Sequence, residues 1–159
     1  MRKLFIALGI VFAVILVAGT VGLFVLARNG AALDAESKAY VDDAVIAITA
    51  HWKKDEFMKR ATPQLLQSAK PKALDDLFDA AGFGLGPLVE YRGAQGQSLM
   101  SATTGTGTVI SANYVAEARF QKGTAAIHIA LLKIDGIWMI NGFNIESTDM
   151  MSNLAGKKT

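Results

Sequence analysis

The chain has 159 residues, of which 52% are hydrophobic and 19% are charged, and its net charge is +2. This length suits one domain plus an additional segment, and not two full domains. The scattered Lys and Arg residues argue against a nucleic-acid-binding face, and the absence of Cys excludes disulfides, thiolate metal sites and a cysteine nucleophile.

Residues 1–28 predict a transmembrane anchor. Met1-Arg2-Lys3 is a short basic lead, and Leu4 to Ala27 contains no charged residue. As a helix this run would reach ~36 Å, enough to cross a hydrocarbon layer of ~30 Å. A cleaved signal peptide is the alternative, but the apolar region of a signal peptide is usually only ~7–15 residues long. The basic lead favours a cytoplasmic N-terminus, which places the rest of the chain in the periplasm of a bacterium, outside the inner (cytoplasmic) membrane.

Three small residues, Gly9, Ala13 and Thr20, lie on one stripe of this expected helix. Such a stripe permits close packing against another transmembrane helix, although small residues are common in spanning helices in any case. Residues 29–33 then read as a short linker before the domain.

The first part of the domain predicts about three helices. Asp34 is a plausible N-cap, and the apolar positions that follow recur at helical spacing to near Ala50. Thr62-Pro63 and then Pro71 each supply a helix start, because proline fits the first turn of a helix. Glycines from Gly82 onward end the helical part.

A four-stranded antiparallel meander follows. Leu88 to Met100 predicts a first strand with a bulge at a glycine, and the alternation from Ile110 to Phe120 predicts a strand with one buried face. Lys122-Gly123 predicts a two-residue turn that sets Phe120 opposite Ala125. Asp135-Gly136 predicts a second turn that sets Leu131 opposite Ile140. The last strand runs to about Ser147, and residues 148–159 predict a flexible tail.

The order of elements and the closing pattern Asp135-Gly136-x-Trp138-x-Ile140-x-Gly142-Phe143 resemble the nuclear-transport-factor-2-like, or cystatin-like, superfamily. In particular the chain resembles membrane-anchored or exported bacterial domains of unknown function in that group. The resemblance implies an α+β fold in residues 34–147, with about three helices on a curved four-stranded sheet. The fold class predicted for the whole chain is thus an N-terminal transmembrane helix followed by a cystatin-like domain.

The face of the sheet away from the helices is the main candidate site, because the alternation leaves apolar residues there with nothing to cover them. The interface candidates are Val115, Ala126, His128, Ala130, Met139, Phe143 and Ile145. A bulge at Asn141-Gly142 would instead turn Phe143 back into the core. The sequence favours the interface.

The predicted function is a membrane-anchored, extracytoplasmic binding or assembly module, either an accessory subunit or a homodimer, and not an enzyme. The sequence shows no cofactor-binding, metal-binding or catalytic constellation. The alternative comes from the resemblance: a cone between helices and sheet that binds a small apolar ligand, with isomerase-like or hydrolase-like chemistry. Tyr40 and Tyr114 are the pocket candidates for that alternative.

Overall fold

The computed structural model describes residues 30–103 and 107–156 of the chain. The chain divides into two compact units, Met1–Leu33 and Asp34–Thr159. Apart from the first residues of the leading helix, every element described belongs to the second unit.

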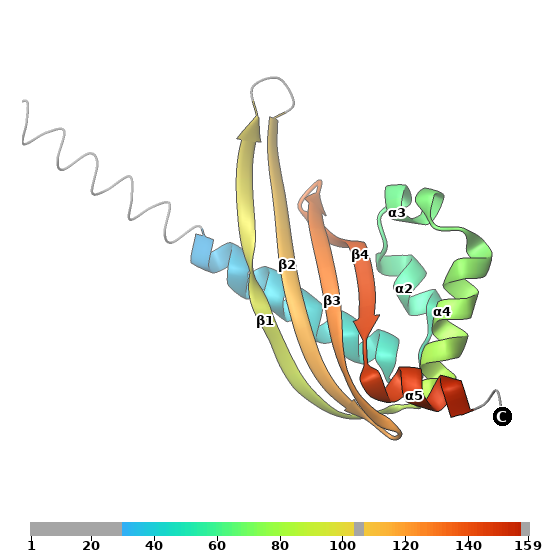
Figure 1. Ribbon diagram of the computed structural model, residues 1–159. Helices are drawn as coiled ribbons and strands as arrows, with labels where there is room; N and C mark the ends of the chain where they lie inside the picture. Colours follow the sequence, from blue (N-terminus) through green and yellow to red (C-terminus); the bar gives the residue numbers. More distant parts are fainter. Residues whose placement is uncertain (1–29, 104–106, 157–159) are drawn as a thin grey trace, which may run out of the picture. The chain divides into compact units, whose positions relative to one another are not determined.

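A long helix over residues 30–49 is followed by three shorter helices and then by the strands. The helices are α2 (Lys54–Arg60), α3 (Pro63–Ser68) and α4 (Pro71–Gly84). The strands are β1 (Leu88–Thr103), β2 (Gly107–Phe120), β3 (Gly123–Ile134) and β4 (Ile137–Glu146), and helix α5 (Thr148–Gly156) follows them. All neighbouring strands are antiparallel, in the order β1-β2-β3-β4, and Figure 1 shows them side by side as a curved sheet.

The long helix forms because its apolar residues recur at helical spacing, and those residues bury it against the sheet. Val41, Ala44, Val45 and Ile48 are all completely buried. Between the long helix and the sheet, the core also contains buried side chains from β2, β3 and β4. They include Ala112, Ala116, Phe120, Ile127, Ile129, Leu131 and Ile140.

The start of the long helix is held to three strands by polar contacts. The Tyr114 hydroxyl on β2 lies 2.9 Å from the Ser37 hydroxyl and donates to the Asp34 carbonyl at 3.1 Å. The Asp34 carboxylate accepts hydrogen bonds from Ser98 on β1, and Lys133 on β3 pairs with Glu36 at 2.6 Å. These bonds fix where the helix crosses the sheet.

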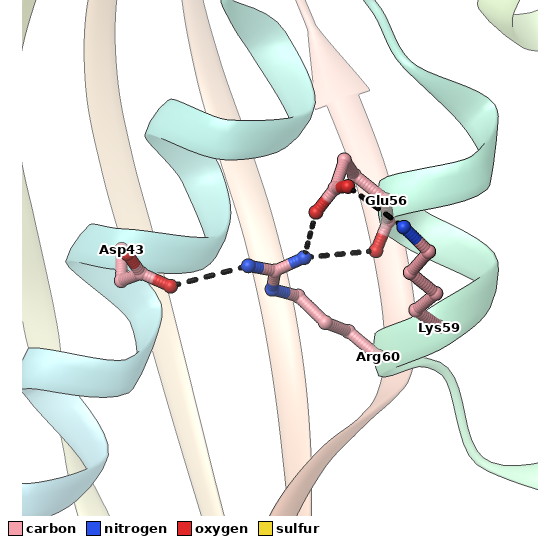
Figure 2. Close-up of polar contacts among 4 residues, drawn as sticks. All are labelled: Asp43, Glu56, Lys59 and Arg60. Atoms are coloured by element: carbon pink, nitrogen blue, oxygen red, sulfur yellow. Dashed lines mark hydrogen bonds and ion pairs between the residues drawn. The ribbon is translucent and has the colours of Figure 1, made fainter.

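Arg60 at the end of α2 joins that helix to the long one (Figure 2). Its guanidinium donates to Asp43 at 3.2 Å, to the Glu56 carbonyl at 3.3 Å and to the Glu56 carboxylate. Lys59 pairs with the same carboxylate of Glu56 at 3.2 Å. The hydrogen bond from Arg60 is the main cause that lowers the pKa of Glu56.

The turn at Asp135-Gly136 has the backbone conformation that its sequence demands. Both residues have positive φ, 50° and 80°, as in a type I′ hairpin turn, and Ile134 pairs with Ile137 across it. Leu131 consequently lies opposite Ile140.

The turn between β2 and β3 lies one residue earlier than the sequence predicts. Phe120 pairs with Gly123, so the turn residues are Gln121 and Lys122, and each pairing is displaced by two positions. The displacement preserves which face each side chain occupies. Tertiary contacts set it: the N–H groups of Gln121 and Lys122 donate to the carbonyls of Pro87 and Leu85.

The predicted fold class is wrong in its membrane part. Within residues 30–103 and 107–156, no helix is both long enough and apolar enough to span a membrane. The helix that the structure describes first carries charges at Asp34, Glu36, Lys38, Asp42 and Asp43. The anchor predicted over residues 1–28, with its packing stripe of Gly9, Ala13 and Thr20, lies outside the described residues.

Three other expectations about the helices are also wrong. Residues 30–33 are helical and not a linker. The domain has five helices in the described residues, not about three. The expected flexible tail contains α5, which packs on α4 and β3 because Met150 is buried and Asn153 donates to the carbonyls of Gly84 and Lys122.

Candidate functional site: the outer face of the sheet

The outer face of the sheet is the face that the long helix does not cover. On β2 it carries the odd-numbered residues, and on β3 the even-numbered ones, as the burial pattern of each strand shows. Val115 lies opposite His128, and Asn113 lies opposite Ala130. The structure therefore brings Val115, Ala126, His128, Ala130 and Met139 together on this face.

Phe143 and Ile145 do not belong to the outer face. Asn141 is an extra residue in β4, because Leu131 pairs with Ile140 but the neighbouring Ala130 pairs with Gly142. Such a bulge reverses the side on which the following residues point. Phe143 and Ile145 therefore point to the helix side, opposite the buried residues Ile129 and Ile127.

The bulge at Asn141 is held by the chain that precedes α3. The Thr62 N–H donates to the Ile140 carbonyl at 2.8 Å, and the Thr62 hydroxyl donates to the Asn141 side-chain oxygen at 3.0 Å. The Phe143 ring then lies 5.3 Å from Phe57 and 6.4 Å from Phe78 between ring centroids. Asn144 and Glu146 occupy the positions on the outer face that were predicted for Phe143 and Ile145.

The outer face has a larger apolar patch, and Met139 is its only member among the interface candidates from the sequence. It lies at the distal end of the sheet, where the β1–β2 and β3–β4 connections are. Four of its aliphatic side chains are highly exposed: Leu99 (54%), Val109 (43%), Ile134 (40%) and Ile137 (65%). Leu132 and Met139 are half-buried between them and pair with one another. We call these six residues the distal patch.

A signal for the distal patch was present in the sequence. Ile134 and Ile137 flank the Asp135-Gly136 turn, and a hairpin places such flanking residues opposite one another on the same face. The alternation of β3 and β4 could therefore have been continued to the turn. The second strand was predicted from Ile110, so the strand pairing of Val109 with Ser101 was not foreseen.

The other half of the outer face is polar. His128 Nε2 lies 3.2 Å from a carboxylate oxygen of Glu146, and Arg119 pairs with Glu90 at 3.1 Å. The hydrogen bond from Arg119 is the main cause that lowers the pKa of Glu90. An open hollow of about 610 Å³ lies over this half, and its lining includes Glu117, His128 and Glu146. These side chains are exposed, so their pairing is a surface contact and offers no dry site for chemistry.

The two pocket candidates are parts of the packed interior or its margin. Tyr114 is 3% exposed, and its hydroxyl is already bonded to the start of the long helix. Tyr40 is half-buried, and burial raises the pKa of its hydroxyl. The third tyrosine, Tyr91, donates to the Asp42 carboxylate at 2.6 Å, and its pKa is raised by burial first and then by that bond. The structure does not bring Tyr40 and Tyr114 together around a described hollow.

Metal binding has no support in the described part of the chain, where no group of three or more His, Asp or Glu side chains is placed to hold an ion. No protein-family model matches the chain, and no curated protein matches it. The superfamily resemblance accordingly remains a prediction from the closing pattern of the sequence.

Proposed function

We propose that this protein is a binding or assembly module that docks another protein on the outer face of its sheet, and that it is not an enzyme. One observation carries the proposal: the distal patch gathers four highly exposed aliphatic side chains from all four strands. Contiguous exposed apolar patches on soluble domains commonly mark interaction surfaces. The proposal does not depend on a membrane anchor.

The surroundings of the distal patch support docking of a protein. An apolar centre beside a polar margin is the usual arrangement of a protein–protein interface. Here the paired charges of His128 with Glu146 and of Arg119 with Glu90 supply polar groups on the same face. The cone alternative has no comparable support, because the described interior is filled by completely buried side chains such as Ile48, Phe120 and Ile127.

The experiment compares two exposed isoleucines. A photoreactive phenylalanine analogue replaces either Ile137, in the distal patch, or Ile46, on the outside of the long helix, in the full chain in its own cells. Ile137 is 65% exposed and Ile46 is 43% exposed, so both are accessible to a reagent. We expect defined protein adducts from position 137 and none from position 46.

A second comparison measures the strength of the contact. For this comparison the photoreactive analogue replaces Ile134, another residue of the distal patch. Burying an isoleucine contributes about 1.5–3 kcal/mol, so Ile137→Lys should weaken the association captured from position 134 by roughly tenfold or more. Ile46→Lys is the matched control and should leave it unchanged. Equal adduct yields at 137 and 46, or an unaffected association in Ile137→Lys, would show that the distal patch is not the docking surface.

A further inference from the structure

The two edges of the sheet differ in how they are covered. The β4 edge is met by the chain before α3, where Ala61 bridges to Ile140 in parallel. The β1 edge has no strand or bridge beside it in the described residues. An open edge presents backbone N–H and C=O groups that can pair with another strand.

The first part of β1 is protected against such pairing. Its register shifts twice, between Leu88 and Glu90 and between Tyr91 and Gly93, and it carries the charges of Glu90 and Arg92. Bulges and charges are common devices that prevent edge-to-edge contact. Residues 94–103 have no such protection. Their pairing with β2 is regular, and the sequence from Gly93 to Ala116 contains no charged residue and no proline.

One backbone group shows which residues of this edge point outward. The Ser98 N–H donates to the Asp34 carboxylate at 2.6 Å and so does not serve the β2 ladder. In an antiparallel pair, every second residue directs its N–H and C=O away from the partner strand. Gly96 and Met100 are two residues from Ser98, so their backbone groups point to the same open edge.

The side chains at the edge are apolar on both faces of the strand. Leu99 lies on the outer face, opposite Ser111, and Met100 lies on the helix side, opposite Ile110. Both are 54% exposed. A partner docked on the outer face would cover Leu99 alone, whereas a strand added to the edge would cover both.

We propose that the β1 edge over residues 94–103 pairs antiparallel with the same edge of a second copy of this chain. A twofold axis at this edge sets the outward backbone N–H groups of each copy opposite outward C=O groups of the other. The paired segments do not repel one another, because residues 94–103 carry no charge. With the axis at Leu99, this residue lies opposite its equivalent, and Met100 lies opposite Ser98 of the second copy. Asp34 limits the pairing, because a Ser98 N–H bonded to its carboxylate cannot donate to an incoming strand.

Disulfide formation between single cysteines tests the pairing directly, since the chain has no Cys of its own. Leu99 bonds to β2 and, with the twofold axis at this residue, would face its equivalent across the new edge as a non-hydrogen-bonded pair, with Cα atoms about 4.5 Å apart, within disulfide range. Under mild oxidation, full-length Leu99→Cys should form a covalent homodimer. Ile137→Cys, on the same face but on the far strand, should not.

Two backbone-directed variants in the Leu99→Cys background test the mechanism. Met100→Pro removes one outward N–H without removing a ladder bond, and it should lower the dimer yield by roughly tenfold, whereas Met100→Ala should retain most of the yield. Asp34→Ala should raise the yield severalfold. Asp43→Ala, which removes the same charge from the far side of the helix, should not. If Met100→Pro fails to fold, Met100→Lys places a charge at the edge instead.

The outcomes separate this proposal from the docking function. A dimer yield at position 99 no higher than at position 137 would overturn edge pairing, as would an adduct at position 99 made only with a different protein. Unchanged yields in Met100→Pro and Asp34→Ala would also overturn it. Absence of photo-adducts at position 137 would defeat the docking function and leave edge pairing standing.

Discussion

Replacing Phe143 by alanine distinguishes the structure from the sequence interpretation, in which this residue belongs to an interface. In the structure its ring lies 5.3 Å from Phe57 and 6.4 Å from Phe78, and those two rings are 2% and 5% exposed. A fully buried Phe→Ala change costs about 3–5 kcal/mol, and each lost aromatic pair accounts for about 0.5–1.5 kcal/mol. Because Phe143 is itself half-buried, we expect the free energy of unfolding to fall by about 2–3 kcal/mol.

The assay is urea unfolding of the full chain followed by circular dichroism. The midpoint should fall while the slope with urea stays the same, and the thermal midpoint should drop by about 10 °C, at roughly 4 °C per kcal/mol for a domain of this size. Phe83→Ala is the matched control, because Phe83 is 39% exposed and its ring contacts Lys122 at the surface; it should cost less than about 1 kcal/mol. If Phe143→Ala costs no more than Phe83→Ala and alters association instead, the bulge assignment is refuted.

Two of the three further predictions concern contacts between the long helix and the sheet, and one concerns the close approach of β1 to β2. Tyr114→Phe removes the hydroxyl that bonds to the buried Ser37 hydroxyl and to the Asp34 carbonyl, and it should lower the free energy of unfolding by about 1–2 kcal/mol in urea. A loss below about 0.5 kcal/mol would contradict these contacts. Gly96→Ala would place a Cβ 2.0 Å from a carbonyl oxygen of β2 and should lower the free energy of unfolding by about 2 kcal/mol or more. Gly142→Ala, whose Cβ would lie 3.2 Å from its nearest atom, should lower it less. Equal losses would contradict the close approach of β1 to β2. Hydrogen bonds from Ser98 on β1 lower the pKa of Asp34 in the folded state. The contribution of Asp34 to stability is therefore present above its unfolded-state pKa of about 4, and it is lost as the pH falls through the lower folded-state pKa. Asp34→Asn should therefore flatten the acid side of the stability profile measured by urea unfolding, and an unchanged profile would count against this bond.

Most of the sheet could be predicted because local chemistry and burial agree there. Strict alternation in β2 assigns its two faces, and Asp135-Gly136 adopts the positive φ values that its composition favours. The start of α3 at Thr62-Pro63 could be predicted for the same reason, since it depends on neighbouring residues: the Thr62 side chain accepts a hydrogen bond from the Leu65 N–H. Each of these features depends on residues only a few positions apart.

The errors arise where distant parts of the chain decide the local conformation. Gly123 looked like a turn residue, but in the structure a Cβ at this position would lie 2.3 Å from the Asp149 side chain. The absence of a side chain at Gly123 permits α5 to approach, but the residues of α5 were predicted to be a flexible tail. No pattern in residues 120–125 contains that information, because Asp149 approaches from the far end of the chain.

The bulge at Asn141 is the most consequential long-range effect on the candidate site. Gly142 made a bulge conceivable, but alternation alone could not choose between a regular strand and an interrupted one. The choice depends on Thr62, which bonds to β4 from a helix start nearly eighty residues earlier, and on the space between Phe57 and Phe78. A sequence argument that treats β4 by itself assigns Phe143 and Ile145 to the wrong face.

The same bulge determines how the two proposed surfaces relate. Without it, Phe143 and Ile145 would extend the apolar area along the whole of β4; with it, the exposed aliphatic residues concentrate at the distal end, beside the open edge of β1. Leu99 is common to both surfaces, whereas Ile137 lies three strands away from the edge. A second copy paired along β1 would therefore cover Leu99 and leave Ile137 accessible. Edge pairing and docking can then occur together, with one distal patch presented by each copy of the pair.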